Sequence, residues 1–161
     1  MTADVKKILL LGYGNPARAD DGLGPAVAEY VEKLDLPGVT VDSDYQLTIE
    51  DSAAVAENDV VIFADASANC AEPFVFEPLK AGSVGSFSSH SVEPAEVMTL
   101  AENLFKSKAK GFVLGIRGYE FDKFDSPLTE KAKKNLGKAL VFLTDLLKTK
   151  NFDKNKDVAC F

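Results

Sequence analysis

Short apolar segments alternate with helical patterns along almost the whole chain. Apolar or alternating runs predict strands over residues 7–12, 39–44, 59–66, 74–78 and 111–118. Apolar residues at helical spacing predict helices over residues 23–34, 48–58, 93–105 and 127–150. Because the connections are short, this order favours a mostly parallel sheet with helices on both faces. The sequence therefore predicts an α/β fold with three layers, α/β/α.

The chain has no internal repeat and no linker, so residues 1–161 are predicted to form one domain. Its ordered core is expected over residues 5–150, followed by a polar C-terminal tail over residues 151–161. Prolines beside and within the run 74–78 favour an edge strand, which we expect to be antiparallel. A stripe on the last helix is predicted to face the core: Leu128, Ala132, Leu136, Leu140, Leu143 and Leu147.

Composition excludes several classes of partner. A net charge of -7 and a pI near 4.7 argue against a nucleic-acid surface, which needs a basic face. The longest apolar runs are too short to cross a bilayer, and the N-terminal residues lack a secretory pattern, so no membrane contact is expected. Cys70 and Cys160 are too few for a disulfide framework, which favours the reducing cytoplasm.

The predicted topology also indicates where a ligand would bind. In open parallel sheets, ligands gather outside the carboxyl ends of the strands. The segments that follow the first three predicted strands are residues 12–24, 44–48 and 65–70. We expect them to border one crevice.

The glycine-rich turn after the first strand allows a nucleotide site. Gly12, Gly14 and Ala17 match the loose pattern G-x-G-x-x-G/A, and Asp42 or Asp44 could bind a ribose. However, Asp20 and Asp21 follow in the same turn and would face the phosphates. Two like charges 4 Å apart repel by roughly 4 kcal/mol at an effective dielectric constant near 20. A dinucleotide- or phosphate-binding protein is therefore the alternative interpretation.

Acidic residues and the single histidine suggest a metal site instead. Asp21 precedes the first helix, Asp65 ends the third strand, and His90 lies in a Gly/Ser-rich loop. Two carboxylates and an imidazole suit zinc or another divalent first-row ion. Each residue also has a structural explanation: a helix cap for Asp20 or Asp21, a turn for Asp65, and a hydrogen bond for His90. The residues alone do not name a reaction.

Three segments resemble the hydrogenase maturation proteases, endopeptidases that trim the C-terminus of nickel–iron hydrogenase large subunits. These are "ILLLGYGNPARADDGLG", "VVIFADAS" and "SSHSVEPAEVM", and the resemblance extends over about residues 7–147. It implies a twisted five-stranded, mostly parallel sheet. It also implies that Asp21, Asp65 and His90 act as the catalytic residues and contact nickel already loaded in the precursor. No permanent organic cofactor is expected, and zinc or cadmium could substitute for nickel in vitro.

The resemblance also suggests residues that contact the precursor: Asn15, Asp20, Asp44, Gln46 and Arg117. Aromatic residues after the last strand, including Tyr119, Phe121 and Phe124, either shape a groove or pack under the long helix. Cys70 is expected to behave as a small buried residue. We expect a monomer. A metallochaperone-like partner of a hydrogenase subunit, which binds without cutting, is a further alternative.

Overall fold

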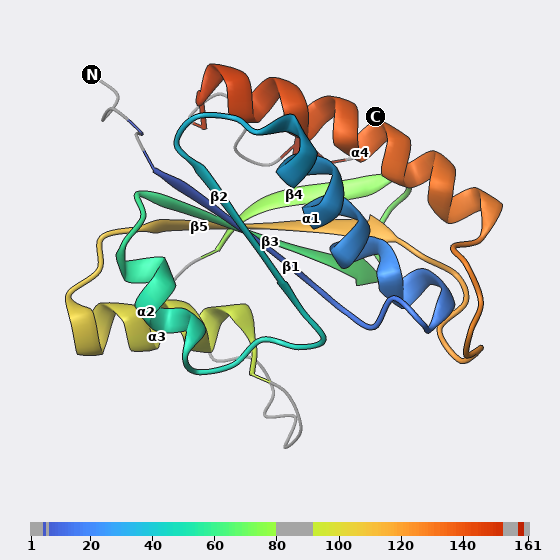
Figure 1. Cartoon of the computed structure of the whole chain (residues 1–161), viewed down its shortest axis with the longest axis horizontal. Coiled ribbons are helices and arrows are strands. Elements are labelled where there is room, and N and C mark those ends of the chain that lie inside the picture. The colour runs from blue at the N-terminus through green and yellow to red at the C-terminus, as the bar shows by residue number, and fades with distance from the viewer. Residues whose placement is uncertain (1–4, 6, 80–91, 153–157, 160–161) are drawn as a thin grey trace.

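A computed structural model describes residues 5, 7–79, 92–152 and 158–159 of the chain. The described residues form a twisted sheet between two layers of helices (Figure 1). The strands are β1 (Ile8–Tyr13), β2 (Val39–Asp44), β3 (Val60–Ser67), β4 (Phe74–Leu79), β5 (Lys110–Arg117) and β6 (Val158–Ala159). The helices are the 3-10 turn η1 (Ala19–Gly22), α1 (Leu23–Leu34), α2 (Asp51–Ala56), α3 (Pro94–Phe105) and α4 (Glu130–Thr149).

The strand order confirms a mostly parallel sheet. Within the described part of the chain the order is β2-β1-β3-β5-β4-β6, and the first four strands are parallel. β4 runs antiparallel to β5, as predicted, but it is not the last strand of the described sheet. The short β6 pairs with it at Val75 and Phe76. Pro78 lies beyond this pairing, so its missing N–H group does not interrupt the β4–β6 ladder.

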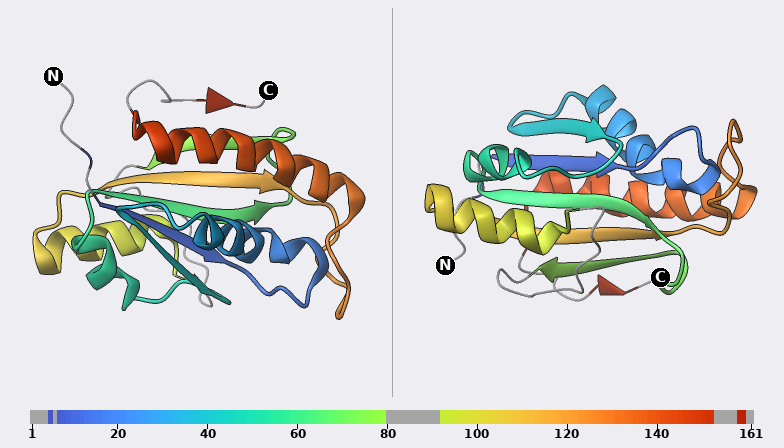
Figure 2. Two further views of the ribbon diagram at one scale, coloured as in Figure 1. Left: turned by 45° about the horizontal axis from the view of Figure 1, so that its top comes forward. Right: turned by 90° about the horizontal axis from the view of Figure 1, so that it is seen from below.

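Helices cover both faces of the sheet, which confirms the three layers. α1 and α4 pack on one face, and α2 and α3 pack on the other (Figures 1 and 2). Alternate residues of β1 enter two separate cores: Ile8 and Leu10 face α1 and α4, whereas Leu9 and Leu11 face α2 and α3. Because both faces are buried, the central strands are apolar throughout instead of alternating with polar residues.

The predicted helices are correct in number and order among the described residues, but α2 and α4 begin three residues later than expected and α3 begins one residue later. α2 starts at Asp51 because residues 48–50 form a turn, in which the Thr48 N–H group donates to Asp51 Oδ2 at 2.8 Å. α4 starts at Glu130, where the Thr129 hydroxyl caps it by accepting from the Ala132 N–H group at 3.2 Å. α3 begins at Pro94 after a capping box of Glu93 and Glu96.

All six residues of the predicted stripe lie in the core or pack against it, although Leu128 precedes the start of α4. Ala132, Leu143 and Leu147 are buried, whereas Leu128, Leu136 and Leu140 are partly buried. The buried face also includes Asn135, Ala139 and Leu146. Its width follows from the position of α4, which packs against α1 as well as against the sheet. No helix in the described ranges is long and apolar enough to cross a membrane.

The core extends to Phe152, beyond the predicted end at residue 150. The sequence predicts a polar tail from residue 151, but the Phe152 side chain is only 5% exposed. Its ring lies 5.2 Å from the Phe112 ring, measured between centroids, and joins the core under α4. The core therefore extends past α4, and β6 adds a further contact between the tail and the sheet.

We expect the substitution Phe152→Ala to lower the free energy of unfolding by about 3 kcal/mol, because it leaves a cavity beside Phe112. Urea denaturation measures this change. The control is Phe105→Ala, at a side chain that is 50% exposed, with an expected loss of less than about 1 kcal/mol. Equal losses for the two variants would contradict the assignment of Phe152 to the core.

Candidate active site

The candidate site lies at the carboxyl ends of the parallel strands. β1, β2, β3 and β5 all end at the same edge of the sheet (Figure 2). The segments that leave this edge are residues 14–22, 45–50, 68–73 and 118–129. They overlap the three segments that the sequence predicts to border a crevice, residues 12–24, 44–48 and 65–70.

The turn after β1 is held by Asp21. The Asn15 N–H group donates to Asp21 Oδ2 at 2.7 Å, and the Ala17 N–H group donates to Asn15 Oδ1 at 2.9 Å. Gly14 has φ +141°, and a Cβ atom there would lie 2.1 Å from the Asp21 carbonyl oxygen. Glycine is therefore required at this position. These contacts fix Asp21 and Asn15 relative to each other. Asn15 therefore helps to hold the Asp21 carboxylate in place.

The same turn does not suit a dinucleotide. The N–H groups that would bind phosphate already donate within the protein: Gly14 to the Asp44 carbonyl at 3.1 Å, Asn15 to Asp21, and Arg18 to the Asn15 carbonyl at 3.0 Å. Gly12 serves a different purpose, because a Cβ atom there would lie 2.3 Å from the Gly24 carbonyl oxygen. It lets α1 approach β1 closely. The geometry therefore argues against the nucleotide alternative.

Asp20 has a structural role in place of the predicted substrate contact. Its side chain is 0% exposed and accepts four hydrogen bonds of 2.7–3.0 Å from three residues: Tyr119, Glu120 and Thr129. Burial alone would raise the pKa of Asp20, but these hydrogen bonds outweigh it and lower the pKa below its usual range. Asp20 thus joins the turn before α1 to the segment between β5 and α4. Neither Asp20 nor Asp21 caps α1, whose N-cap is Gly22.

Asp65 lies near the end of β3 in an acidic environment. Burial raises its pKa to about 7, and the nearby charges of Asp21 and Glu93 act in the same direction. Hydrogen bonds from the Ala66 N–H group, at 2.8 Å, and from the Tyr13 hydroxyl oppose this shift only in part. The structure therefore brings Asp21 and Asp65 together. A carboxyl group with a pKa near neutrality can exchange protons at physiological pH.

Tyr13 and Glu93 are site residues that the sequence analysis missed. Tyr13 ends β1, and its buried hydroxyl faces Asp65, so burial and the charges of Asp65 and Glu93 raise its pKa. Glu93 enters the site as the N-cap of α3. The pairing of β1 with β3 could have indicated Tyr13, because the two strands are parallel and Tyr13 follows the pair Gly12–Ala64. Glu93 gave no comparable signal.

The chemistry of the donor set fits a divalent cation. Two acids share one edge of the sheet; burial raises the pKa of Asp65, and the charge of Asp21 adds to this effect. A cation beside them would favour the ionised forms. The third predicted residue, His90, lies outside the described residues. Within those residues, no group of three His, Cys, Asp or Glu side chains is arranged to hold an ion. The predicted set of Asp21, Asp65 and His90 thus stays a prediction.

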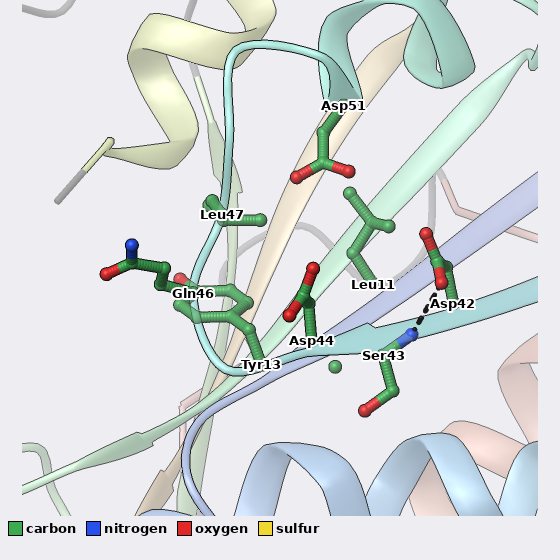
Figure 3. Close-up of a pocket in the computed structure, with 9 residues that line it drawn as sticks. Leu11, Tyr13, Asp42, Ser43, Asp44, Gln46, Leu47 and Asp51 are labelled. Atoms are coloured by element: carbon green, nitrogen blue, oxygen red, sulfur yellow. Dashed lines mark hydrogen bonds between the residues drawn. The ribbon is translucent and has the colours of Figure 1, made fainter.

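A pocket next to Tyr13 contains two more of the predicted residues. Asp44 and Gln46 line it together with Asp42 and Asp51 (Figure 3). Burial raises the pKa of Asp51, and the charges of Asp42 and Asp44 add to this effect. Asp44 also accepts from the Tyr45 N–H group at 2.7 Å, which holds the start of the β2–α2 segment. Contacts of Asp44 and Gln46 with a substrate remain a prediction.

The segment after β5 is only partly packed against the core. Arg117 donates from Nη1 to the Cys70 carbonyl at 2.8 Å, and its guanidinium lies 5.3 Å from the centre of the Tyr119 ring. Tyr119 packs against the core under α4, whereas Phe124 is 68% exposed and does not. Cys70 is half-buried. Arg117 therefore supports the turn after β3, and a contact with substrate stays a prediction.

Comparison with solved structures identifies the fold. HycI, a nickel–iron hydrogenase maturation protease from Thermococcus kodakarensis KOD1, is similar with a TM-score of 0.72 and 22% identity, over 89% of this chain and 94% of HycI. HybD, a hydrogenase maturating endopeptidase from E. coli, gives 0.65 and 19%, over 90% and 94%. A hydrogenase 2 maturation peptidase from the Thaumarchaeota archaeon SCGC_AB-539-E09 gives 0.64 and 19%, over 89% and 99%.

The sequence comparisons add nothing to this result. No protein-family model and no curated protein matches the chain. The structural matches extend over nearly all of this chain and of each protein compared. The chain therefore has the fold of hydrogenase maturation proteases, as the resemblance of its three segments predicts.

The substitution Asp20→Ala should lower the free energy of unfolding by about 3 kcal/mol, because it leaves partly buried N–H donors of Tyr119, Glu120 and Thr129 without their acceptor. Chemical denaturation provides the measurement. Asp122→Ala is the control: the Asp122 side chain is exposed and its ion pair with Arg18 is 3.9 Å long. We expect a loss of less than about 0.5 kcal/mol there. A small effect at Asp20 would refute its structural role.

The raised pKa of Asp65 predicts a specific pH dependence of stability. Between pH 4 and pH 7 the folded protein keeps a proton on Asp65 that the unfolded chain has lost. The contribution of Asp65 to stability is therefore present below pH 4 and is lost as the pH rises to about 7. We expect Asp65→Asn to match the wild type near pH 4 and to exceed it by up to about 4 kcal/mol at pH 8. Urea unfolding at both pH values tests this, and a pH-independent difference would contradict it.

Proposed function

We propose that the protein is a hydrogenase maturation endopeptidase, which removes the C-terminal extension of a nickel-loaded hydrogenase large-subunit precursor. One observation carries this proposal: two acids, Asp21 and Asp65, come together at the carboxyl edge of a sheet whose fold is that of known maturation proteases. The fold alone does not specify an activity. The acids supply the chemistry at the position where such sheets bind ligands.

In this proposal the cation belongs to the substrate. Asp21, Asp65 and His90 contact the nickel ion that the precursor carries, and zinc or cadmium can replace it in vitro. The support comes from the electrostatics of the unliganded acids. The charges of Asp21 and Glu93 disfavour ionisation of Asp65. A cation brought by the precursor would reverse this penalty, since opposite charge favours the ionised form.

The penalty also explains how the enzyme would distinguish loaded from unloaded precursor. A precursor without metal leaves the acids uncompensated, so it gains no binding energy at this position. A loaded precursor gains that energy in addition to its peptide contacts. Discrimination by a missing partner is effective when the unpaired groups are partly shielded from water, as the half-buried Asp65 is.

Asp65 is the proposed proton acceptor for hydrolysis. A water oxygen forms a bond to the scissile carbonyl carbon while a carboxylate takes one of the water protons. The carbon–nitrogen bond then breaks, and the proton passes to the leaving amine. The cation of the precursor would favour the ionised carboxylate that this step needs, whereas burial raises the pKa of Asp65 to about 7 in the unliganded protein. Asp21 is the neighbouring acid whose charge contributes to this pKa.

The remaining predicted contacts belong to peptide recognition. Asp44 and Gln46 line the pocket beside Tyr13, and Arg117 and Asn15 border the same edge of the sheet. We propose that the extension of the precursor lies along this edge, and that the enzyme acts as a cytoplasmic monomer. Asp20 is not among the proposed contacts, since its carboxylate is fully buried.

The test is cleavage of a nickel-loaded precursor followed by mass spectrometry. We expect Asp21→Asn, Asp65→Asn and His90→Ala to lower the cleavage rate at least about 100-fold, since each removes a group proposed to contact the metal or accept a proton. The wild type should leave metal-free precursor uncut. Asp145→Asn is the matched control, because Asp145 is exposed on α4.

Two outcomes would overturn the proposal. Unchanged cleavage by Asp65→Asn would show that the assigned site is wrong. If the wild type binds loaded precursor stably and the mass of the precursor does not change, the protein would instead be a metallochaperone-like partner. Melting temperatures of the variants that are no lower than that of the wild type would exclude unfolding as the cause of a lost activity.

A further inference from the structure

The last residue of β1 lies beside the last acid of β3. β1 and β3 are parallel and in register up to the pair Gly12–Ala64, so Tyr13 and Asp65 are the next neighbours along the two strands. The strand alternation puts both side chains on the face covered by α2 and α3, because Leu11 and Phe63 face that side. The Tyr13 and Ala64 carbonyl oxygens lie together beneath Gly24, within 2.7 Å of the position that a Cβ atom would take there.

The side chain of Tyr13 spans two parts of the site. Its ring lines the pocket that contains Asp44 and Gln46 (Figure 3). Its hydroxyl, at the other end, makes a hydrogen-bonding interaction with the Asp65 carboxyl, close to Glu93. A buried tyrosine hydroxyl normally has a hydrogen-bond partner, and Asp65 supplies it here. Tyr13 thus belongs to the pocket through its ring and contacts Asp65 through its hydroxyl.

Two donors therefore hold the Asp65 carboxyl group. The Ala66 N–H group donates to Oδ1 from the same strand, and the Tyr13 hydroxyl approaches from the neighbouring strand. One donor leaves a carboxyl group free to rotate about its terminal bond, which has a broad torsional preference. A second donor on another strand restricts that rotation. Asp21, the other acid of the site, is held separately by the Asn15 N–H group.

We propose that Tyr13 is a positioning residue, whose hydroxyl orients the Asp65 carboxyl group toward Asp21 and the substrate. This inference rests on the proposed function, and it assigns a residue that acts through Asp65 without touching the reacting atoms. Groups that orient a metal-contacting carboxylate change metal affinity or activity by 10- to 100-fold when removed. A phenylalanine at position 13 would keep the ring in the pocket and lose only the hydroxyl.

The first measurement needs no activity. A double-mutant cycle compares Tyr13→Phe, Asp65→Ala and the double variant by urea unfolding. We expect the two substitutions to be coupled by at least about fivefold in the unfolding equilibrium constant. Tyr30→Phe is the matched control, because Tyr30 is 41% exposed on α1, and it should show no coupling with Asp65→Ala. Absence of coupling for Tyr13 would overturn the inference.

The second measurement is cleavage of nickel-loaded precursor by Tyr13→Phe. We expect kcat to fall about tenfold or more while KM changes less than twofold, and Tyr30→Phe to behave as the wild type. A raised KM with an unchanged kcat would overturn the inference, because Tyr13 would then contact the peptide directly. An active wild type with an equally active Tyr13→Phe variant would also overturn it and leave the proposed function intact. A wild type that does not cut the precursor contradicts both.

Discussion

The parallel pairing of β1 with β3 is the constraint on which the site depends. It makes both strands end at the same edge of the sheet, so the turn that carries Asp21 and the strand end that carries Asp65 leave the fold at the same place. Its register also places Tyr13 beside Asp65. An antiparallel arrangement would send the two acids to opposite edges. The close approach of α1, which Gly12 and Gly24 permit, then covers this pair of strands.

Asp20 and Asp21 show how surroundings separate two identical neighbours. Asp20 points into the protein, where four hydrogen bonds keep it ionised and join two segments that are about 100 residues apart in the sequence. Asp21 is half-buried, accepts a hydrogen bond from the Asn15 N–H group and contributes to the field at Asp65. One acid therefore stabilises the rim of the site, and the other belongs to the site itself. Their difference comes from the number of donors each one meets.

Much of the fold follows from patterns that the sequence displays. The bounds of α1 and β2 agree with the predicted ranges, because periodic apolar residues and flanking turn residues are local signals. The start of α2 and the burial of Phe152 do not agree with the predictions from the sequence. Thr48 and Asp51 form a turn where a helix is predicted to begin, and Phe152 follows polar residues that suggest a solvated tail. The turn at Thr48 is a local alternative to a helical turn, which the apolar pattern does not distinguish. The burial of Phe152 depends on the distant Phe112, to which a local pattern is insensitive.

The sequence by itself determined the order of strands and helices along the chain, the edge of the sheet where a site would form, and the residue types available there. Only the tertiary structure decided which acid is buried and bonded, that Tyr13 faces Asp65, and that the N–H groups of the glycine turn are already occupied. The physical reason is the separation along the sequence over which each property is determined. Strand and helix patterns are set by neighbours along the chain, whereas burial and hydrogen bonding are set by residues that folding brings together.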